Sequence, residues 1–388
     1  MPTKFNPIKL KIVDPPYGSK LTDLVIELDY LRKKPLGGTT HPSIFFQLKS
    51  IFHTLESIGS ARIEGNRTTI ADFIETKISD PHIKDEKILE IKNGENSLIY
   101  IDEYIEKQKG DLNRIFLSNL HKGVVDKLTP PPQGEGSNYP GEYRKKQIHI
   151  AGSNLLPPDY LQVPSYMDEL LEFINKKDLP KYDLLKTAIA HHRFTWIHPF
   201  DNGNGRTVRL FTYAMLVKLG FNIHIGRIIN PTAVFCNNRN EYYEKLSKAD
   251  TGRDENILEW CEYVLSGLKI EIEKIDRLLD YKYLSSNILL PSVAFALERK
   301  LINNDEAKIL KIAVKKQVFE ASDIRVEFPD KIPAEISRMI RRLKERKMID
   351  TETNQKRKYV LCFANNYLLR GIIDMLDKNG FLPLPLHK

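Results

Sequence analysis

The nine residues HPFDNGNGR, at positions 198–206, constrain this chain more than any other stretch. They separate two segments with a helical spacing of apolar residues, 181–197 and 206–220. Gly203 and Gly205 favour a break between these helices, because glycine accepts positive φ angles and lets a ligand approach the backbone closely. The pattern therefore predicts two helices joined by a loop that carries the chemistry.

The composition of this loop favours an anion site. Backbone amides around Gly203 and Gly205, together with the N-terminus of the following helix, would form a concavity for negative charge. Arg206 and Arg209 are three residues apart, so on a helix both guanidinium groups lie near the same anion. We expect the side chain of Asn204 to add amide donors.

His198 lies at the opposite end of the loop, where an imidazole suits a general base near neutral pH. Phe200 is expected to pack inward and to anchor the loop. The alternative is a glycine-rich turn between helices, with a hydrogen-bonded histidine and two surface arginines. The joint occurrence of these residue types in register favours the anion site.

The stretch from His198 to Arg209 resembles the signature of Fic-domain proteins, HxFx[D/E]GNGRxxR. With the surrounding helices, the resemblance covers about residues 40–275. It implies a mainly α protein, namely a Fic-fold helical bundle with a short β-hairpin flap. It also implies an enzyme that transfers AMP from ATP to a hydroxyl side chain of a target protein and releases pyrophosphate.

The resemblance assigns a role to each position of the motif. His198 is implied to take the proton of the target hydroxyl, Arg206 to bind the β-phosphate and Arg209 to bind the γ-phosphate. Glycine rather than lysine at position 205 favours AMP transfer, because a kinase-like branch of the family has lysine there. The nest for the α- and β-phosphates is implied to consist of Gly203, Asn204 and Gly205.

Asn202 departs from the pattern, because the family usually has Asp or Glu there as a Mg²⁺ ligand. An amide oxygen coordinates a hard cation but brings no charge. Asp201, one residue earlier, is expected to point elsewhere. The resemblance implies ATP as substrate and Mg²⁺ as cofactor, and Asn202 admits a weaker enzyme or one that uses Mn²⁺.

A second motif, Ser60-x-x-x-Glu64-Gly65, precedes the signature. Ser60 and Glu64 share one face of a helix, which Gly65 ends. Taken alone, the motif describes a helix C-terminus with a solvated glutamate. It is similar to the inhibitory motif of Fic proteins, [S/T]xxxE[G/N], in the class whose inhibitory helix is N-terminal. Glu64 is thereby implied to pair with Arg209 in the place of the γ-phosphate.

Two further segments flank the signature. The alternating residues of 141–152 predict the first arm of a hairpin. In Fic proteins such a flap aligns the target by strand addition, and the alternative is a hairpin without a partner.

The segment NRNEYYEKL resembles the family helix beside the adenine, although aromatic residues at helical positions more often belong to the core. The adenine-side candidates are Asn238, Tyr242 and Tyr243.

The last quarter of the chain changes character. Three short helical patterns are followed by a charged turn and a strand, the order of a winged helix-turn-helix. The basic side chains expected to contact DNA are Arg338, Arg341, Arg342 and Lys344, with Lys356, Arg357 and Lys358 at the tip of the wing. The alternative is a module for protein contacts or dimerisation.

The length of 388 residues suggests several structural units. We expect an N-terminal helical region with the inhibitory helix at 1–105, the Fic core at 106–285, the winged helix at 290–365 and a C-terminal helix or tail at 366–388. Three scattered cysteines indicate neither disulfides nor zinc. The net charge of +8 permits an anionic partner. Without an apolar run of membrane length or a signal peptide, a cytoplasmic location is expected.

The sequence thus predicts an autoinhibited protein adenylyltransferase whose partner is a target protein with a reactive hydroxyl. Self-modification, DNA contact through the winged helix and a homo-oligomer are further expectations, and a membrane partner is not expected. One alternative is a DNA-binding regulator that senses a nucleotide. Another is removal of AMP at the same site, with Glu64 positioning water, and a third is a toxin-like role.

Overall fold

The computed structural model describes residues 5, 7–34, 39–79, 85–108, 110–150, 155–221, 228–352, 355 and 357–382. The chain divides into two compact units, each assembled from separate stretches of sequence. The first, which we call the signature unit, comprises Met1–Pro35, His53–Thr68 and Lys84–Ile272. The C-terminal unit comprises Leu36–Phe52, Thr69–Ile83 and Glu273–Lys388.

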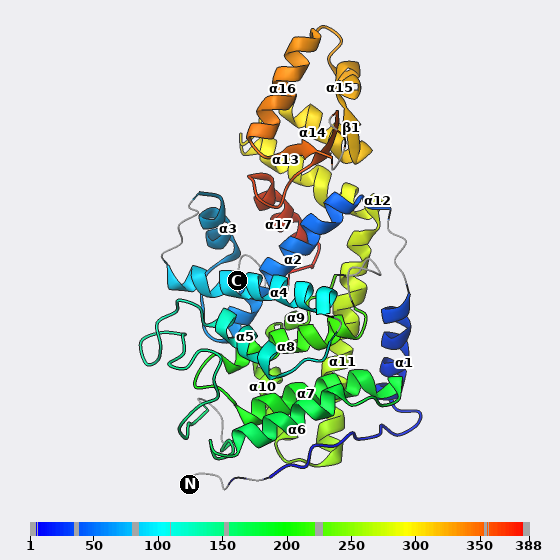
Figure 1. The fold of residues 1–388 in the computed structure, drawn as a ribbon. Helices are drawn as coiled ribbons and strands as arrows, with labels where there is room; N and C mark the ends of the chain where they lie inside the picture. Colours follow the sequence, from blue (N-terminus) through cyan, green and yellow to red (C-terminus); the bar gives the residue numbers. More distant parts are fainter. Residues whose placement is uncertain are drawn as a thin grey trace. The chain divides into compact units, whose positions relative to one another are not determined.

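Within its described residues, the signature unit is built from helices (Figure 1). Helices α2 and α11 contribute residues to both units. The helices are α1 (Lys20–Lys33), α2 (Pro42–Ile63), α4 (Glu86–Gln108), α5 (Arg114–Val124), α6 (Val163–Asn175), α7 (Asp183–Ile197), α8 (Asn204–Lys218), α9 (Thr232–Cys236), α10 (Arg239–Ala249) and α11 (Asp254–Asp276), with a short 3₁₀ turn at Pro180–Tyr182.

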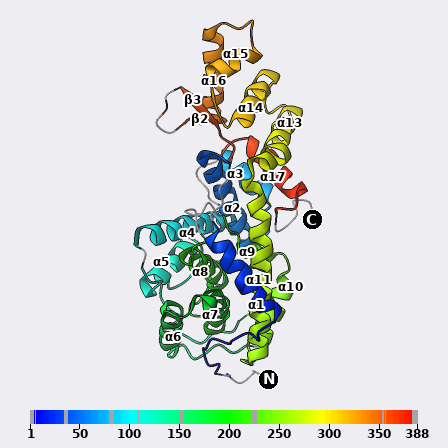
Figure 2. The same ribbon diagram turned by 90° about the vertical axis from the view of Figure 1, so that its right-hand side faces the viewer.

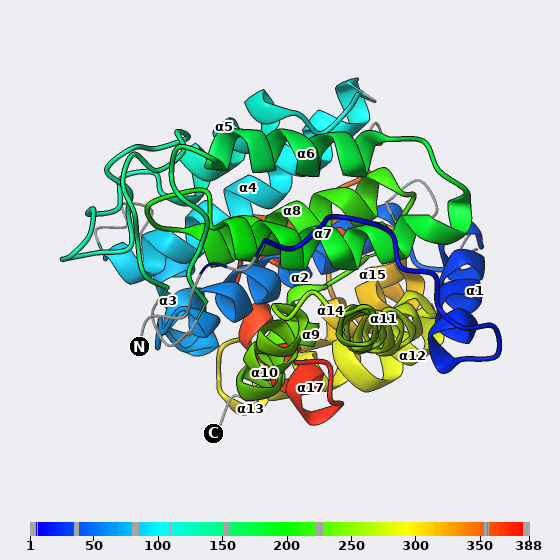
Figure 3. The ribbon, with the colours of Figure 1, turned by 90° about the horizontal axis from the view of Figure 1, so that it is seen from below.

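Helices α7 and α8 flank the signature loop and lie side by side in the middle of this unit (Figure 3). Nearly every residue of both helices is buried, because α6 covers α7 while α4 and α5 cover α8. A helix that is buried on all sides is a rigid support. The loop between α7 and α8 is therefore held at both ends by the core, as the sequence predicts.

The C-terminal end of α2 also packs in the signature unit. Ala61 and Ile63 are buried, and the backbone amide of Asn66 donates to the Ala61 carbonyl over 3.0 Å. Gly65 has a φ of 104°, a left-handed conformation that closes the helix at little cost only for glycine. The predicted helix stop at these residues is confirmed.

Helix α2 approaches α4 closely because α4 has a glycine at the contact. A Cβ atom on Gly94 would lie 2.8 Å from the Ser57 hydroxyl and 2.9 Å from its Cβ atom. The helix axis of α1, on another side of the unit, runs beside α11 (Figure 2). Two ion pairs join them, Lys20 with Glu262 at 3.0 Å and Lys269 with Glu27 at 3.0 Å.

The segment that predicts a hairpin carries no strand in its described part, residues 141–150. The segment that follows it contains Pro157 and Pro158, which have no amide hydrogen to donate to a ladder. Side chains connect the two arms instead. Gln147 donates to the Pro157 carbonyl over 3.0 Å, and Arg144 donates to the Pro158 carbonyl. The remaining predicted residues, 151 and 152, lie outside the described residues.

The C-terminal unit contains a small sheet packed against helices (Figures 1 and 2). Its antiparallel strands have the order β1-β3-β2, with Phe319 opposite Tyr359 and Asp350 opposite Val360. The elements are α3 (Ile70–Ser79), a 3₁₀ turn (Arg277–Leu279), α12 (Tyr281–Leu284), a π turn (Ser285–Leu289), α13 (Leu290–Glu298), α14 (Asn304–Lys316), β1 (Val318–Glu320), α15 (Ala321–Glu327), α16 (Pro333–Glu345), β2 (Ile349–Thr351), β3 (Lys358–Leu361) and α17 (Leu368–Lys378).

The described residues from α14 to β3 form three helices and three short strands. The winged helix-turn-helix expected from the sequence stays a prediction. Ile336, Ile340 and Leu343 form the buried face of α16, as predicted. Among the described residues, no helix is both long enough and apolar enough to cross a membrane.

Candidate active site

The signature loop is stabilised from within by Asn204. Its Oδ1 atom accepts a hydrogen bond from the Phe200 amide, and its Nδ2 atom donates to the Phe200 carbonyl, both over 2.9 Å. The Asn204 side chain is only 3% exposed. Both polar groups of the side chain thus bond to the loop, and the expectation that Asn204 adds donors for an anion stays a prediction.

Two glycines determine how the loop joins the N-terminus of α8. Gly203 has a φ of 72° and is the N-cap of α8, whereas Gly205 lies within the first turn of that helix. The first amides of a helix have no partner within the helix, so this turn presents donors and a positive dipole end. Of the two glycines, only Gly203 has the positive φ that the sequence suggests for such a loop.

His121, on α5, fixes the loop from outside. Its ring stacks on Phe200 with 3.7 Å between the centroids and 1° between the planes. Its Nδ1 atom accepts from the Gly141 amide over 2.8 Å, and its Nε2 atom donates to the Asn202 carbonyl over 3.0 Å. Acceptance at Nδ1 requires the neutral ring, and burial lowers the pKa of His121 to about 4.

The acidic and amide groups of the loop are turned toward the protein. Asp201 accepts hydrogen bonds from the hydroxyl of Ser137 and from the backbone and side chain of Asn138. The Oδ1 atom of Asn202 accepts from the Gly203 amide over 2.8 Å. Among the described residues, no group of three or more His, Cys, Asp or Glu is placed to hold a metal ion. This arrangement does not fit a Mg²⁺ site with a carboxylate ligand.

Arg209 is almost completely buried and makes three hydrogen bonds to the end of α2. Its Nε atom donates to the Ser60 hydroxyl over 2.9 Å, and its NH2 group donates to the Ser60 carbonyl over 3.0 Å. The same NH2 group lies 2.6 Å from Oε1 of Glu64. The contact between Glu64 and Arg209 that the resemblance implies is present, and Ser60 takes part in it.

The electrostatics of this contact follow from burial and charge. Burial alone would raise the pKa of Glu64, but Arg209 lowers it, with smaller contributions from Arg206 and His198, and the result lies below the ordinary value. Burial alone would lower the pKa of Arg209, but the Glu64 carboxylate raises it. Both groups are thus charged at neutral pH.

Gly205 makes room for Glu64. A Cβ atom at position 205 would lie 2.1 Å from Oε1 of Glu64 and 3.1 Å from the NH1 atom of Arg209. The Glu64 carboxylate therefore lies directly on the first turn of α8, where a helix N-terminus attracts an anion. Any side chain at position 205 would displace it.

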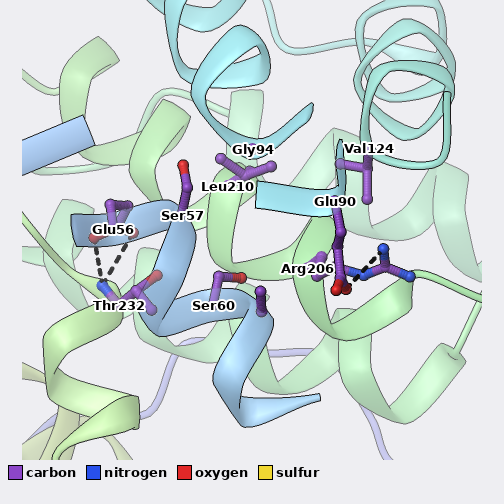
Figure 4. A pocket seen from close by; sticks show the side chains of 10 residues that line it. Glu56, Ser57, Ser60, Glu90, Gly94, Val124, Arg206, Leu210 and Thr232 are labelled. Atoms are coloured by element: carbon purple, nitrogen blue, oxygen red, sulfur yellow. Dashed lines mark hydrogen bonds and ion pairs between the residues drawn. The ribbon is translucent and has the colours of Figure 1, made fainter. Parts of the chain in front are cut away.

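Arg206 is also paired with carboxylates. Its NH1 atom lies 3.1 Å from Oε1 of Glu90 on α4, as Figure 4 shows. Its NH2 atom donates to the Glu135 carbonyl over 2.6 Å and lies 3.4 Å from Oε2 of Glu135. Burial raises the pKa of Glu90, partly opposed by Arg206. The sequence patterns indicate neither glutamate.

A small cavity lies beside Arg206, between α2, α4 and α8 (Figure 4). Glu56 lines it one helical turn before Ser60. Both carboxylate oxygens of Glu56 lie near the Thr232 amide, at 3.0 and 3.1 Å. Burial raises the pKa of Glu56 to about 8, so this group is largely protonated at neutral pH. The cavity is also lined by Ser57, Ser60, Ala61, Glu90, Gly94, Val124, Arg206, Leu210 and Thr232.

His198 ends α7 in a left-handed conformation with a φ of 51°. Its amide donates to the Phe194 carbonyl over 2.9 Å, and its own carbonyl accepts from Nε of Arg144 over 3.0 Å. The Nδ1 atom lies 3.3 Å from the Thr195 carbonyl, which only accepts. The Nδ1 atom therefore carries the hydrogen, and the Nε2 lone pair can accept a proton.

The adenine-side candidates separate into a core residue and two surface residues. Tyr242 is 2% exposed, and its hydroxyl hydrogen-bonds to His191 over 3.0 Å, so its expected contact with a base is not possible in this conformation. Tyr243 is 42% exposed, with the Arg239 guanidinium 5.4 Å from its ring. The exposed Asn238 caps α10 through a hydrogen bond from the Glu241 amide.

We predict that His198 does not titrate near neutral pH. Burial lowers its pKa to about 4, with a further lowering by Arg144 that the Thr195 carbonyl and Glu64 oppose. NMR titration of the imidazole resonances, assigned with the His198→Ala variant, should show a constant shift between about pH 6 and 8. A titration midpoint of His198 near pH 6.5 would contradict the prediction.

We predict that Asn202→Asp strengthens divalent cation binding at the loop. The substitution adds a negative charge and a hard oxygen ligand, which increases affinity for Mg²⁺ or Mn²⁺. Mn²⁺ binding, followed by electron paramagnetic resonance with and without ATP, should become about tenfold tighter or more. Asp201→Asn is the control, since Asp201 bonds to Ser137 and Asn138, and equal Mn²⁺ affinity in wild type and Asn202→Asp would refute the prediction.

Comparisons with known proteins find relatives that share sequence with about half of this chain. The protein adenylyltransferase Fic of Nematostella vectensis is 26% identical over 198 residues, 50% of this chain and 42% of that protein. The protein of the same name from Drosophila yakuba is 28% identical over 204 residues, 52% of this chain and 37% of that protein. The chain thus spans about two fifths of the length of these relatives.

The likeness extends to a solved structure and to a family pattern. A crystal structure of a Fic family protein from Desulfovibrio desulfuricans G20 superposes with a TM-score of 0.51 at 17% identity, over 90% of this chain and 98% of that one. At this identity the likeness concerns the fold. A sequence model of the Fic/DOC family matches residues 111–216. Residues 111–216 are therefore similar to the Fic/DOC family.

Proposed function

We propose that this protein is an autoinhibited protein adenylyltransferase that uses ATP to modify a hydroxyl side chain of a target protein. The observation that carries the proposal is the buried contact of Arg209 with Glu64 and Ser60 at the N-terminus of α8. A buried arginine beside a helix N-terminus and a second arginine is a site for a polyphosphate. The similarity to the Fic/DOC family and the names of the related proteins support the same activity.

In the proposed reaction, the target hydroxyl oxygen attacks the α-phosphorus of ATP. The hydroxyl proton passes to Nε2 of His198, which is neutral and has its lone pair available. The bond from the α-phosphorus to the bridging oxygen breaks, and pyrophosphate leaves. Arg206, Arg209 and the first amides of α8 stabilise the negative charge that develops on the phosphate oxygens. The product is the AMP ester of the target.

Glu64 inhibits this reaction by competition. Its carboxylate occupies Arg209 and lies on the first turn of α8, where the phosphates are proposed to bind. ATP must displace a carboxylate that is already paired with the buried Arg209 before it reaches a productive position. The same contact explains why a serine at position 60 accompanies the glutamate, since its hydroxyl accepts a hydrogen bond from Nε of Arg209.

We predict that Glu64→Gly raises AMP transfer about ten- to a hundredfold, because a hydrogen bond between charged groups contributes roughly 1.5–3 kcal/mol. The measurement is incorporation of label from ATP marked at the α-phosphate, together with intact-mass detection of an added AMP on the full chain. Glu64→Gln should be intermediate, because it loses the charge and keeps the size.

Two controls define the outcome. ATP marked at the γ-phosphate should give no incorporation, which separates AMP transfer from a kinase reaction. His198→Ala in the Glu64→Gly background should abolish labelling. Equal labelling by wild type and Glu64→Gly would contradict the inhibitory role, and labelling that survives the loss of His198 would contradict the proposed base.

A second candidate function is DNA binding by the C-terminal unit. The exposed face of α16 carries Ser337, Arg338 and Arg341, and α16 occupies the position of a recognition helix after the α15 turn. Arg341 is held by Glu345 at 3.4 Å, one helical turn further along. Arginines on an exposed helix face supply the phosphate and base contacts of such modules.

We predict that Arg338→Ala with Arg341→Ala weakens binding of the full chain to duplex DNA and lowers the salt slope by about 1–2. Fluorescence anisotropy across a salt series measures both quantities. Lys311→Ala on α14 is the matched control, since this exposed lysine lies outside the proposed recognition helix. Loss of affinity by the control alone, or no DNA binding by wild type at low salt, would exclude this function.

A further inference from the structure

Arg206 is held between two glutamates that differ strongly in burial. The side chain of Glu90 is 4% exposed, and that of Glu135 is 51% exposed. Glu90 is further fixed by Asn66, whose Nδ2 atom donates to it over 2.7 Å. Glu90 is therefore held next to Arg206, whereas the Glu135 carboxylate can rotate away toward solvent without losing hydration.

The backbone of Glu135 has a defined position that does not depend on its side chain. Gly134 and Gly136 flank it, and a Cβ atom at either position would collide with the backbone of residues 128 and 129, at 2.1–2.5 Å. The Gly136 amide donates to the Thr129 carbonyl over 2.8 Å. Arg206 bonds to the Glu135 carbonyl over 2.6 Å, so a substitution of the side chain leaves this contact in place.

The loop around Glu135 is also joined to the signature at a second point. Asp201 accepts from the Asn138 amide over 2.8 Å and from the Ser137 hydroxyl. These bonds hold Glu135 beside the first turn of α8, where its carboxylate lies 3.4 Å from Arg206. A phosphate that approaches Arg206 therefore meets the negative charges of both Glu90 and Glu135.

We propose that Glu135 is a second inhibitory carboxylate, which competes with the β-phosphate for Arg206 while Glu64 competes for Arg209. The proposal rests on the proposed function, in which Arg206 binds the β-phosphate. The Glu135 contact lies on the loop 129–138 and involves Arg206, whereas the inhibitory contact at the end of α2 involves Arg209. Nucleotides with a β-phosphate must displace the Glu135 side chain, whereas AMP need not.

The test compares Glu135→Gln with wild type in the full chain, both with and without Glu64→Gly. Isothermal titration calorimetry measures the Kd of ATP, ADP and AMP. We expect Glu135→Gln to bind ADP and ATP about two- to fivefold more tightly, the range for a half-exposed ion pair, and to leave the Kd of AMP unchanged. With Glu64→Gly, the two effects on ATP should multiply.

Glu142→Gln is the matched control. Glu142 lies further along the same segment, is exposed and pairs with Lys145 at 2.9 Å, so its substitution should leave all three affinities unchanged. High salt should reduce the effect of Glu135→Gln, because exposed charges are screened. An unchanged Kd for ADP in Glu135→Gln, or an equal gain for AMP, would overturn the inference.

Arg206→Ala separates this inference from the function on which it rests. If ADP binds to Glu64→Gly and Arg206→Ala abolishes that binding, the site assignment stands, and Glu135→Gln then decides the inference alone. If no nucleotide binds, or if Arg206→Ala leaves the Kd of ADP unchanged, the proposed function fails and the inference fails with it.

Discussion

The buried guanidinium of Arg209 is the constraint on which the rest of the site depends. A cation that is 1% exposed needs charge and hydrogen bonds in its surroundings, because an unpaired buried charge is strongly destabilising. In this chain Ser60 and Glu64 provide both. The N-terminus of α8 therefore favours an anion beside Arg209, and the question for function is whether this anion belongs to the protein or to a nucleotide.

The geometry of that anion site is maintained by groups with no proposed chemical role. His121 stacks on Phe200 and bonds to the Asn202 carbonyl, and Asn204 bonds twice to the backbone of Phe200. Since these contacts are internal to the protein, the loop is preorganised before any ligand arrives. Preorganised donors stabilise developing charge without a cost of rearrangement during the reaction.

Local signals in the sequence predict the local features. The two helices around the loop, the left-handed Gly203, the helix stop after Glu64 and the buried face of α16 all follow from spacing and glycine positions. Partners that are distant in sequence are not predictable in this way. Glu90 and Glu135 contact Arg206 across more than 70 residues, and only the fold brings them together. Adjacent Tyr242 and Tyr243 show the same limit, because helix rotation decides which of them is buried.

The position of Glu64 within the same chain has a consequence for how any activation must occur. The carboxylate and Arg209 are tethered, so their encounter is intramolecular and its strength is independent of how dilute the protein is. Release by dissociation of a separate inhibitor is not available to this contact. Arg209 is freed by a change in the equilibrium between its paired and released states within one molecule. A higher nucleotide concentration would shift this equilibrium, and so would a ligand that favours another conformation of the turn at Gly65.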